Sequence, residues 1–584
     1  MAETAGDILV ETLVAWGVDT VFGMPGDGIN GIMEALRTHQ DRIRFIQVRH
    51  EESAALAACG YAKWTGRLGV CVATSGPGGI HLLNGLYDAK LDGQPVLAVT
   101  GLQFHDLLGT WTQQDVELDK LFADACVYSA RIMGPTHVEN VTELACRTAL
   151  AYRQPTHVTM PVDIQSMPVS EGKRSKRNVA EHVSDRMARS GHHPDRNQLA
   201  LAAEILNAAE RPFILAGRGA LGAREEIEAV AERLGAPVGK PLLGKAAIPD
   251  DSPYCVGGVG LLGTTPAQDA LEQCDTLLIV GSSFPYIEFY PQPDTARGVQ
   301  IDIDAKRIGL RYPVEAGLVG DSGRVLHDLL PLLRTRDERG WLERAQQGMA
   351  DWRALLEERG TARDKPMKPD VVTYALNKRL SGDTIVVTDS GTVTGWTARH
   401  IQIRGEQMFS CSGTLASMAC GIPYAVAAAI AFPDRPVVVV IGDGGAAMLM
   451  GELATLRKYD LNVKVIVLKN DSLAMIKWEQ LALLGNPEYG CELEPIDFVK
   501  VAEGCGLPAI RIEDPELCAQ QLGDALEKRG PGLIEAVVDP YAPPIPPKLR
   551  AKDALHLAEA LARGTPHRGR LALTVASDVV RELV

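Results

Sequence analysis

Two oxygen-bearing side chains, Asp443 and Asn470, each follow a run of apolar residues, and together they could hold a metal ion. Asp443 lies in the glycine turn Gly442–Gly445 after the run Val437–Ile441, and Asn470 follows a second run, Val463–Leu468. A carboxylate and an amide oxygen suit a hard cation such as Mg²⁺, which readily takes further oxygens from phosphates. Glycines at a helix start let backbone N–H groups approach an anion. These residues predict a site for Mg²⁺ and a diphosphate, with an ordinary glycine turn as the alternative.

The elements that must position this pair are a strand, a helix and a second strand. Val437–Ile441 is rich in β-branched residues, which predicts a buried parallel strand. Ala446–Tyr459 is predicted to be a helix, because its leucines recur on one face. A right-handed crossover then places Val463–Leu468 beside the first strand. Asp443 and Asn470 would therefore meet at the edge of the sheet where open α/β sheets bind ligands.

Glu51 is a second candidate for chemistry. It lies in Arg49-His50-Glu51-Glu52, between the predicted strand Ile43–Val48 and a predicted helix that runs through Trp64. An acidic residue in the first turn of a helix commonly does no more than complement the helix dipole, and this is the alternative. The neighbouring Glu52 is expected to face the solvent.

The length of 584 residues is too great for one core and predicts several domains. Strands alternate with helices through most of the chain, so the predicted fold class is α/β with three doubly wound parallel-sheet domains. Changes of composition at 170–194 and 336–370 mark connectors. The predicted domains are 1–170, 195–335 and 371–541, followed by a C-terminal tail, 542–584.

Composition excludes several classes of protein. The net charge of −15 argues against nucleic acid as a partner. No apolar run approaches the ~18 residues of a membrane span, and the N-terminus lacks the basic and apolar regions of a signal peptide. Eleven cysteines without C-x-x-C pairs suggest reduced thiols rather than disulfides or zinc ligands. We therefore expect a cytoplasmic protein.

The segment G-D-G, followed after 25 residues by Asn470-Asp471, resembles the signature of thiamine-diphosphate enzymes. The R-H-E pattern at Glu51 and T-S-G-P-G-G at 74–79 resemble the pyrimidine-binding domain of this family. The resemblance implies that Asp443, Asn470 and the carbonyl of Ser472 bind Mg²⁺, and that Glu51 activates the coenzyme through its pyrimidine ring. It implies thiamine-diphosphate contacts from Gly26, Ser75, Asn84, Gly391, Thr392, Ala416, Met418, Gly442, Gly444 and Gly445. Met418 would hold the coenzyme bent, and core packing is the alternative for its side chain.

Residues 217–222 form G-x-G-x-x-G after the predicted strand Pro212–Ala216, which alone is a weak dinucleotide signal. The segments G-L-L-G, S-F-P-Y, Q-I-D-I-D and L-V-G-D that follow resemble the flavin-binding middle domain of pyruvate oxidases. The resemblance implies FAD contacts from Gly217, Arg218, Gly219, Gly260, Gly263, Ser283, Asp302 and Asp321. The alternative is that this domain keeps the fold without a flavin.

The whole chain is most similar to the pyruvate oxidase and pyruvate:quinone dehydrogenase branch of the acetohydroxyacid synthase superfamily. This resemblance implies oxidative decarboxylation of a 2-oxo acid such as pyruvate to acetate or acetyl phosphate, with electrons passing from FAD to quinone or oxygen. Gln113 and Glu479 would face the reacting carbon, although a lone glutamate on a helix is more often solvated.

The chain departs from the family pattern at two aromatic positions. The family segment Phe-Gln-Glu is replaced within Trp111–Asp115, and Met475 stands where relatives have a second Phe. The main alternative is therefore a non-redox carboligase of the acetolactate synthase type, with structural FAD or none. A non-catalytic homologue is disfavoured, because Glu51, Asp443 and Asn470 are all present.

The resemblance also implies a homodimer at least, and a homotetramer as the expected assembly. From Lys548 onward the tail carries seven basic and four acidic residues. A basic, partly apolar tail could make peripheral contact with a membrane at its inner face. The alternative is a tail that packs on its own subunit or covers the active site.

Overall fold

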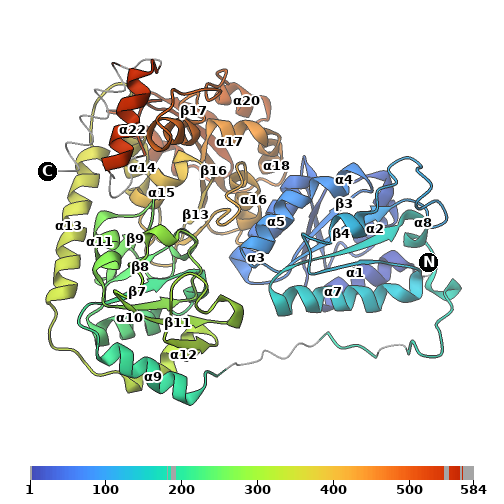
Figure 1. The fold of residues 1–584 in the computed structure, drawn as a ribbon. Helices are drawn as coiled ribbons and strands as arrows, with labels where there is room; N and C mark the ends of the chain where they lie inside the picture. Colours follow the sequence, from blue (N-terminus) through green and yellow to red (C-terminus); the bar gives the residue numbers. More distant parts are fainter. Residues whose placement is uncertain (1–2, 180–181, 186–192, 545–550, 566–568, 570–584) are drawn as a thin grey trace.

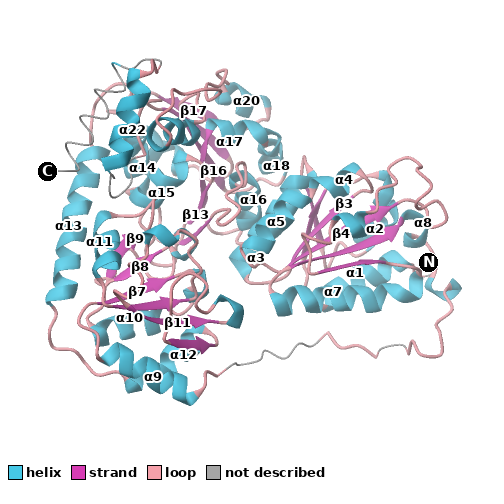
Figure 2. Ribbon diagram, viewed as in Figure 1, coloured by secondary structure: helices cyan, strands magenta, loops and turns pink. Residues whose placement is uncertain are grey.

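Three parallel six-stranded sheets, each with helices on both faces, make up the computed structural model (Figure 1, Figure 2). The structure describes residues 3–179, 182–185, 193–544, 551–565 and 569. Alternate residues of a strand enter different cores: Cys71 and Ala73 lie in one hydrophobic cluster, whereas Val70 and Val72 lie in another. The predicted fold class is confirmed.

The first sheet has the strand order β2-β1-β3-β4-β6-β5. Its strands are β1 Thr20–Gly23, β2 Arg44–Gln47, β3 Gly69–Ala73, β4 Val96–Leu102, β5 Tyr128–Arg131 and β6 Pro155–Pro161. Its helices are α1 Ala5–Ala15, α2 Asn30–Thr38, α3 Glu51–Thr65, α4 Pro77–His81, α5 Leu83–Leu91, α6 Leu118–Leu121, α7 Val138–Tyr152 and α8 Val162–Gln165. The strand order reverses between β1 and β3, so the turns after these two strands meet at a ligand-binding edge.

The second sheet has the order β12-β11-β10-β7-β8-β9, which is the order of dinucleotide-binding sheets. Its strands are β7 Pro212–Ala216, β8 Val238–Lys240, β9 Cys255–Gly258, β10 Thr276–Val280, β11 Arg297–Asp302 and β12 Ala316–Val319. Its helices are α9 Arg196–Asn207, α10 Arg224–Leu234, α11 Thr265–Gln273 and α12 Ser322–Leu329. The predicted connector at 336–370 contains a long helix, α13 Gly340–Gly360, which buries Trp341 and Trp352.

The third sheet, β14-β13-β15-β16-β18-β17, repeats the topology of the first. Its strands are β13 Ile385–Thr388, β14 Met408–Ser410, β15 Val437–Gly442, β16 Val463–Lys469, β17 Ala509–Ile512 and β18 Gly532–Val537. Its helices are α14 Pro369–Asn377, α15 Thr392–His400, α16 Gly421–Ala431, α17 Asp443–Met448, α18 Leu453–Lys458, α19 Ala474–Trp478, α20 Phe498–Gly504 and α21 Cys518–Leu526. Here the strand order reverses between β13 and β15.

The predicted strand–helix–strand unit is present, with one correction to its helix. Strands β15 and β16 pair in parallel, so that Gly442 lies opposite Leu468. The predicted single helix Ala446–Tyr459 is wrong: the helix begins at Asp443, and a 3₁₀ turn, Met450–Glu452, separates α17 from α18. The interruption contains Gly451, and glycine is a poor helix former.

The first and third sheets share one hydrophobic core. Helix α3 packs against α16, and Tyr424 of α16 donates its hydroxyl to Asp88 of α5. All eleven cysteines are free thiols, as predicted. Within the described ranges, no helix is long and apolar enough to cross a membrane.

Only part of the C-terminal tail lies in the described residues. Helix α22, Ala551–Ala562, packs its buried Ala560 against Trp478 and Leu481 of the same chain. His556 Nδ1 lies 2.7 Å from the carbonyl oxygen of Leu483. The described tail therefore contacts the segment that carries Glu479. The predictions for 545–550, 566–568 and 570–584 concern residues outside the description.

Candidate functional site

The glycine turn after β15 meets the loop after β16. The Asp443 carboxylate accepts backbone N–H groups from Gly444 at 2.9 Å, Asn470 at 2.9 Å and Asp471 at 2.5 Å. Asn470 Oδ1 accepts the N–H of Ser472 at 3.1 Å. Burial raises the pKa of Asp443 above its ordinary value, against these hydrogen bonds. The three predicted metal ligands therefore lie in two adjoining loops.

The surroundings of these ligands fit a divalent ion and a diphosphate. A Cβ built on Gly442 or Gly391 would meet no heavy atom of the described chain within 4 Å, so both glycines border open space. A Cβ on Gly445 would lie 1.9 Å from Asp389 Oδ2, so only glycine fits there. The buried Ser472 Oγ has no hydrogen-bond partner among the described residues. An oxygen-rich ligand set thus faces an open, glycine-lined space.

Met418 lies against the glycine turn. Its Cε is 3.3 Å from the position that a Cβ on Gly444 would occupy. Its loop contains two alanines with positive φ, Ala416 at 55° and Ala419 at 67°. Asp389, which follows β13, accepts the N–H of Ala419 at 3.0 Å, and burial raises the pKa of Asp389 to about 6.

Glu51 begins α3, and its carboxylate lies 3.0 Å from His81 Nδ1. The His81 ring packs on the ring of His50 with centroids 4.4 Å apart. Ligand atoms of His50, Glu51 and His81 all lie within 4.8 Å of one another. The sequence reasoning did not select His81. The feature that could have identified His81 is its position in the sequence, directly after the segment T-S-G-P-G-G-I.

Ser75 contacts one of two adjacent glutamines. The glutamine that it contacts is Gln114, whereas the predicted residue was Gln113. Ser75 Oγ donates to Gln114 Oε1 at 2.8 Å. Gln113 is exposed, and its backbone carbonyl accepts from Gln103 Nε2 at 2.6 Å. Trp111 is 93% exposed. Within one chain, Gln114 rather than Gln113 therefore faces the predicted pyrimidine end.

Asn84 and Glu52 lie in a contact between the first and third sheets. Asn84 Nδ2 donates to Glu52 Oε1 at 2.6 Å and to Ser417 Oγ at 2.8 Å. The expectation that Glu52 faces the solvent is wrong, because this hydrogen bond turns its carboxylate toward α5. Asn84 reaches the loop of Met418 in its own chain.

Gly26 packs against Thr74, whose Cβ would lie 2.5 Å from a Cβ on Gly26.

A cavity of about 1910 Å³ is lined by residues of all three domains, with Lys63 and Asp92 among those of the first. Predicted residues that line it are Asp443, Asn470, Ser472, Gly391, Thr392, Ala416, Met418, Gly442, Gly444, Gly445 and Glu479, together with Arg218, Gly219, Ser283, Asp302 and Asp321. Gly26, Glu51, Ser75, Asn84 and Gln113 are not among its lining residues. One chain therefore brings the metal ligands and the flavin candidates into one cavity and leaves Glu51 outside it.

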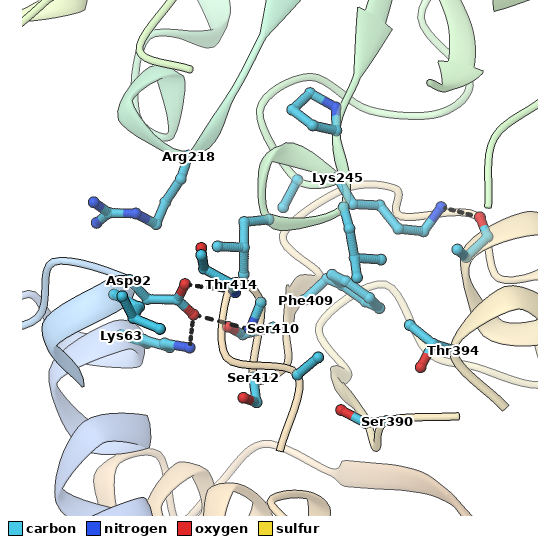
Figure 3. Close-up of a pocket in the computed structure, with 18 of the residues that line it drawn as sticks. Lys63, Asp92, Arg218, Lys245, Ser390, Thr394, Phe409, Ser410, Ser412 and Thr414 are labelled. Atoms are coloured by element: carbon cyan, nitrogen blue, oxygen red, sulfur yellow. Dashed lines mark hydrogen bonds and ion pairs between the residues drawn. The ribbon is translucent and has the colours of Figure 1, made fainter. Parts of the chain in front are cut away.

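The flavin candidates surround the point where the second sheet reverses its strand order. Figure 3 shows Arg218, from the turn after β7, projecting into the cavity. Burial lowers its pKa. Arg307 Nη1 donates to Ser283 Oγ at 2.8 Å. Asp302 and Asp321 lie at the ends of β11 and β12, where Asp321 accepts the N–H of Arg324 at 3.2 Å.

The glycines of this region have a packing role in the fold. A Cβ on Gly217 would lie 2.5 Å from Ser282 Cβ, and one on Gly219 would lie 2.7 Å from Gly281 Cα. Gly260, with φ of 82°, packs on Phe284, and Gly263 packs on the backbone of Gly258. These four glycines are explained by close approach of the turns, without a ligand. Arg218, Ser283, Asp302 and Asp321 remain as the flavin candidates with polar side chains that line the cavity.

Three family models of thiamine pyrophosphate enzymes match separate parts of the chain. Residues 3–121 match the N-terminal TPP binding domain of thiamine pyrophosphate enzymes, 199–329 match the central domain, and 389–536 match the C-terminal TPP binding domain.

Similar proteins extend over almost the whole chain. A putative thiamine pyrophosphate-containing protein, YdaP, of Bacillus subtilis is 37% identical over 547 residues, which cover 94% of this chain and 93% of the relative. A pyruvate oxidase of Lactiplantibacillus plantarum is 34% identical over 555 residues, 94% of this chain and 91% of its own. A probable acetolactate synthase large subunit of Methanocaldococcus jannaschii is 33% identical over 563 residues, 93% of each chain. The chain therefore belongs to the thiamine pyrophosphate enzymes, in the superfamily of acetohydroxyacid synthases and pyruvate oxidases.

Proposed function

We propose that this enzyme oxidatively decarboxylates a 2-oxo acid, with pyruvate as the first candidate, using thiamine diphosphate, Mg²⁺ and FAD. The general part, thiamine-diphosphate-dependent decarboxylation of a 2-oxo acid, is supported by family membership. The product would be acetate or acetyl phosphate, and quinone or oxygen would take the electrons. The observation that carries the redox part is the cavity, which runs from the diphosphate turn to the strand-order reversal of the second sheet.

At the metal end, the chain supplies the binding groups. Asp443, Asn470 and the carbonyl of Ser472 would hold Mg²⁺, and the open space beside Gly391 and Gly442 would admit the diphosphate. Thiamine diphosphate supplies an electron sink for cleavage of the bond to the carboxylate. Met418 would support the coenzyme beside Gly444.

At the pyrimidine end, Glu51 would hold a proton on a ring nitrogen, which is the role of a positioned carboxylate in acid–base catalysis. His81 orients this carboxylate through the 3.0 Å contact to Oε2. Gln114, held by Ser75, is a better candidate than Gln113 for contact with the substrate. Glu479 lines the cavity and would face the substrate from the other side.

The second domain would bind FAD at its strand-order reversal, where sheets of this order bind dinucleotides. Arg218 and Arg307 provide positive charge for a diphosphate, and arginine suits this contact by geometry. The carboxylates of Asp302 and Asp321 would accept hydrogen bonds from ribose hydroxyls. Ser283 completes the polar lining.

A carboligase of the acetolactate synthase type is the second candidate. Met475 occupies a position where the resemblance expects an aromatic ring, and Trp111 is 93% exposed in the single chain. Relatives named acetolactate synthase also match over nearly the whole chain. In that case FAD would be structural or absent.

The deciding experiment adds pyruvate to the purified protein without oxygen and follows the flavin spectrum. Rapid bleaching of the yellow colour, with acetate or acetyl phosphate formed, is the expected result. An unchanged spectrum with acetolactate formed would reject the oxidase in favour of the carboligase. Glu51→Gln should abolish either reaction, and a protein that only binds its ligands would be unaffected by this change.

We further propose that two copies of the chain build each active site. This is supported by the cavity, which contains the predicted metal ligands but not Glu51. A homodimer is then the minimum assembly, with a homotetramer as the expected one. The packing of α22 on its own chain favours the alternative of an own-subunit contact over membrane contact for 551–565.

A further inference from the structure

Helix α5 presents a polar face to the loop between β14 and α16, defined here as the coenzyme loop, Cys411–Cys420. Asn84, Asp88 and Asp92 recur four residues apart, so they lie on one face of the helix and at its C-cap. All three contact the coenzyme loop. Asp92 also borders the cavity and interacts electrostatically with Arg218. Apart from one that Asp88 accepts from α16, the hydrogen bonds that the face makes to the third domain all go to the coenzyme loop.

Asp92 makes the largest number of these contacts. Its Oδ2 accepts the N–H of Gly413 at 2.9 Å, and its Oδ1 accepts the N–H of Thr414 at 2.8 Å. Lys63 of α3 donates to Asp92 Oδ2 at 2.7 Å and to the carbonyl of Cys411 at 2.7 Å. Figure 3 shows this Lys63–Asp92 pair beside Thr414. The side chains of the pair are only 3% and 0% exposed.

The other two residues of the face hold the middle of the coenzyme loop. Ser412 Oγ donates to Asp88 Oδ1 at 2.8 Å and accepts the N–H of Ser417 at 2.9 Å. Asn84 Nδ2 donates to Ser417 Oγ at 2.8 Å. The loop is thus fixed by α5 on both sides of Ala416.

The backbone of the coenzyme loop needs such support. Ala416 and Ala419 adopt the left-handed region with φ of 55° and 67°, which costs a non-glycine residue roughly 1 kcal/mol. A strained conformation persists only where its surroundings determine it. Asp389 fixes the end of the loop through Ala419, and Asp92 fixes its beginning through Gly413 and Thr414.

Charge pairing makes Asp92 dependent on Lys63. A buried carboxylate without a partner would be strongly destabilising. Burial opposes the charge on Lys63, but Asp88 and Asp92 outweigh it and hold the pKa of Lys63 above its ordinary value. Lys63 in turn holds the pKa of Asp92 below its ordinary value, although burial acts in the opposite direction. The pair is therefore charged, and its three hydrogen bonds to the loop are charge-assisted.

We propose that Asp92, paired with Lys63, is a positioning residue that sets the coenzyme loop and thereby places the Ala416 carbonyl and Met418 against thiamine diphosphate. Although Asp92 lines the cavity, its carboxylate is held by Lys63 and by the N–H groups of Gly413 and Thr414, so its proposed role is exerted through the loop. The proposal rests on the proposed coenzyme role of Ala416 and Met418, but it does not depend on which 2-oxo acid or electron acceptor the enzyme uses.

The test is Asp92→Asn in the full-length protein. The variant keeps the size of the side chain but loses the charge and one of the acceptors. Amide hydrogen exchange of 411–420 in the coenzyme-free protein should accelerate at least tenfold. The Kd for thiamine diphosphate with Mg²⁺, measured by calorimetry, should rise at least tenfold. In the loaded enzyme, the circular dichroism band of the pyrimidine imino form should weaken, and kcat should fall more than KM rises.

Asp370→Asn is the matched control. Asp370 is also a buried carboxylate, paired with His400 at 3.2 Å, and it lies on α14 away from the coenzyme loop. The Asp370→Asn substitution should lower Tm. It should change neither the amide hydrogen exchange of 411–420 nor the Kd for thiamine diphosphate by more than twofold. A lower Tm in Asp92→Asn with both of those readouts unchanged would show a merely structural role and overturn the proposal.

A milder variant, Ser412→Ala, covers the case in which Asp92→Asn does not fold. It removes the hydroxyl that links Asp88 to the Ser417 N–H and should also accelerate loop exchange and weaken coenzyme binding. Unchanged exchange in a folded Ser412→Ala protein would contradict the proposal. Absence of pyruvate turnover in the wild type would reject the proposed reaction, whereas loop exchange and coenzyme Kd would still decide the role of Asp92.

Discussion

Asp443 shows how one side chain can prepare two loops for a cation. Three backbone N–H groups hold its carboxylate, so its geometry is set before any metal binds. Burial raises the pKa of Asp443, so ionisation of this carboxylate costs free energy. A bound divalent cation would offset that cost. The metal site and the coenzyme site are therefore expected to fill together.

Asp443→Asn should weaken Mg²⁺-dependent binding of thiamine diphosphate by on the order of 100-fold, since even groups behind a metal ligand commonly change affinity 10- to 100-fold. Titration calorimetry with and without Mg²⁺ measures this change. Asp460→Asn is the control, because Asp460 is exposed and its positive φ of 47° is one that Asn tolerates. Equal affinities for wild type and Asp443→Asn would remove Asp443 from the metal site.

His157 gives a residue-scale prediction about stability. It is fully buried between Thr100 and Ser129, with both contacts at 2.8 Å, and burial lowers its pKa from 6.5 to about 3. The unfolded chain binds a proton below about pH 6.5, whereas the folded chain does not. Stability is therefore fully present above pH 6.5 and falls as pH decreases from 6.5 toward 3.

At pH 5 this difference corresponds to about 2 kcal/mol, or roughly 5 °C in Tm for a domain of this size. His157→Gln should reduce the Tm loss between pH 7 and pH 5 by about that amount, measured by scanning calorimetry. His193→Gln, at an exposed histidine, should leave the loss unchanged. A His157→Gln protein with the wild-type pH dependence would show that His157 does not titrate as its burial requires.

At the scale of elements, the same turn geometry serves both ends of the proposed coenzyme site. The first and third sheets share one strand order, and each places a glycine-containing turn at the reversal point. The third sheet adds the coenzyme loop, whose conformation is set by contacts from α5 and Asp389 rather than by its own sequence. The backbone strain in that loop can be measured by substituting glycine for an alanine of positive φ.

Ala419→Gly and Ala427→Gly make the same chemical change at two buried positions, 1% and 0% exposed. Ala427 lies within α16, where glycine costs roughly 1 kcal/mol relative to alanine. Ala419 has φ of 67°, where glycine relieves roughly 1 kcal/mol of strain. Thermal unfolding should therefore show Ala419→Gly to be the more stable variant by about 2 kcal/mol. Equal destabilisation would mean that the loop carries no backbone strain.

At the scale of the whole molecule, Glu51 lies outside the cavity that contains the predicted metal ligands, which is the basis of the proposal that two copies of the chain build each site. Glu51 follows strand β2 of the first sheet, and Asp443 follows strand β15 of the third. If two copies of the chain pair these groups across an interface, defective subunits should complement one another. Complementation is expected if each site takes residues from two copies, and it is not expected if each site lies within one chain.

Glu51→Gln and Asp443→Asn subunits, each inactive alone, should regain about a quarter of wild-type activity when they are unfolded, mixed and reassembled, or co-expressed. Random pairing makes half of the dimers mixed, and each mixed dimer contains one intact site and one doubly altered site. Mixtures of each variant with itself are the controls. Zero recovery in mixtures that form normal dimers would place Glu51 and Asp443 in the same chain's site.

Much of the fold, and the meeting of Asp443 with Asn470, could be predicted from the sequence because both depend on short-range patterns. Apolar runs followed by glycine turns predict parallel strands with sites at their carboxyl ends, and β15 and β16 pair as this pattern requires. Asp443 and Asn470 each directly follow one of two paired strands. Their relative position is therefore nearly fixed once the strand–helix–strand unit forms. For the same reason Ser472 lies with them.

The remaining features depend on contacts between residues far apart in the chain, which no local pattern contains. Gln114 rather than Gln113 faces Ser75, because the backbone of the loop decides which of two adjacent glutamines points inward. His81 and Glu51 meet because α4 and α3 converge. Asn84 and Ser417 meet across 333 positions.

The sequence by itself therefore determined the three sheets and the proximity of Asp443, Asn470 and Ser472, since periodicity and spacing express local geometry, and its motifs pointed to the family by resemblance. Only the tertiary structure decided that α5 contacts the coenzyme loop, that residues of all three domains line one cavity, and that Glu51 lies outside it. These are properties of packing, in which the position of each side chain is set by neighbours contributed by other elements.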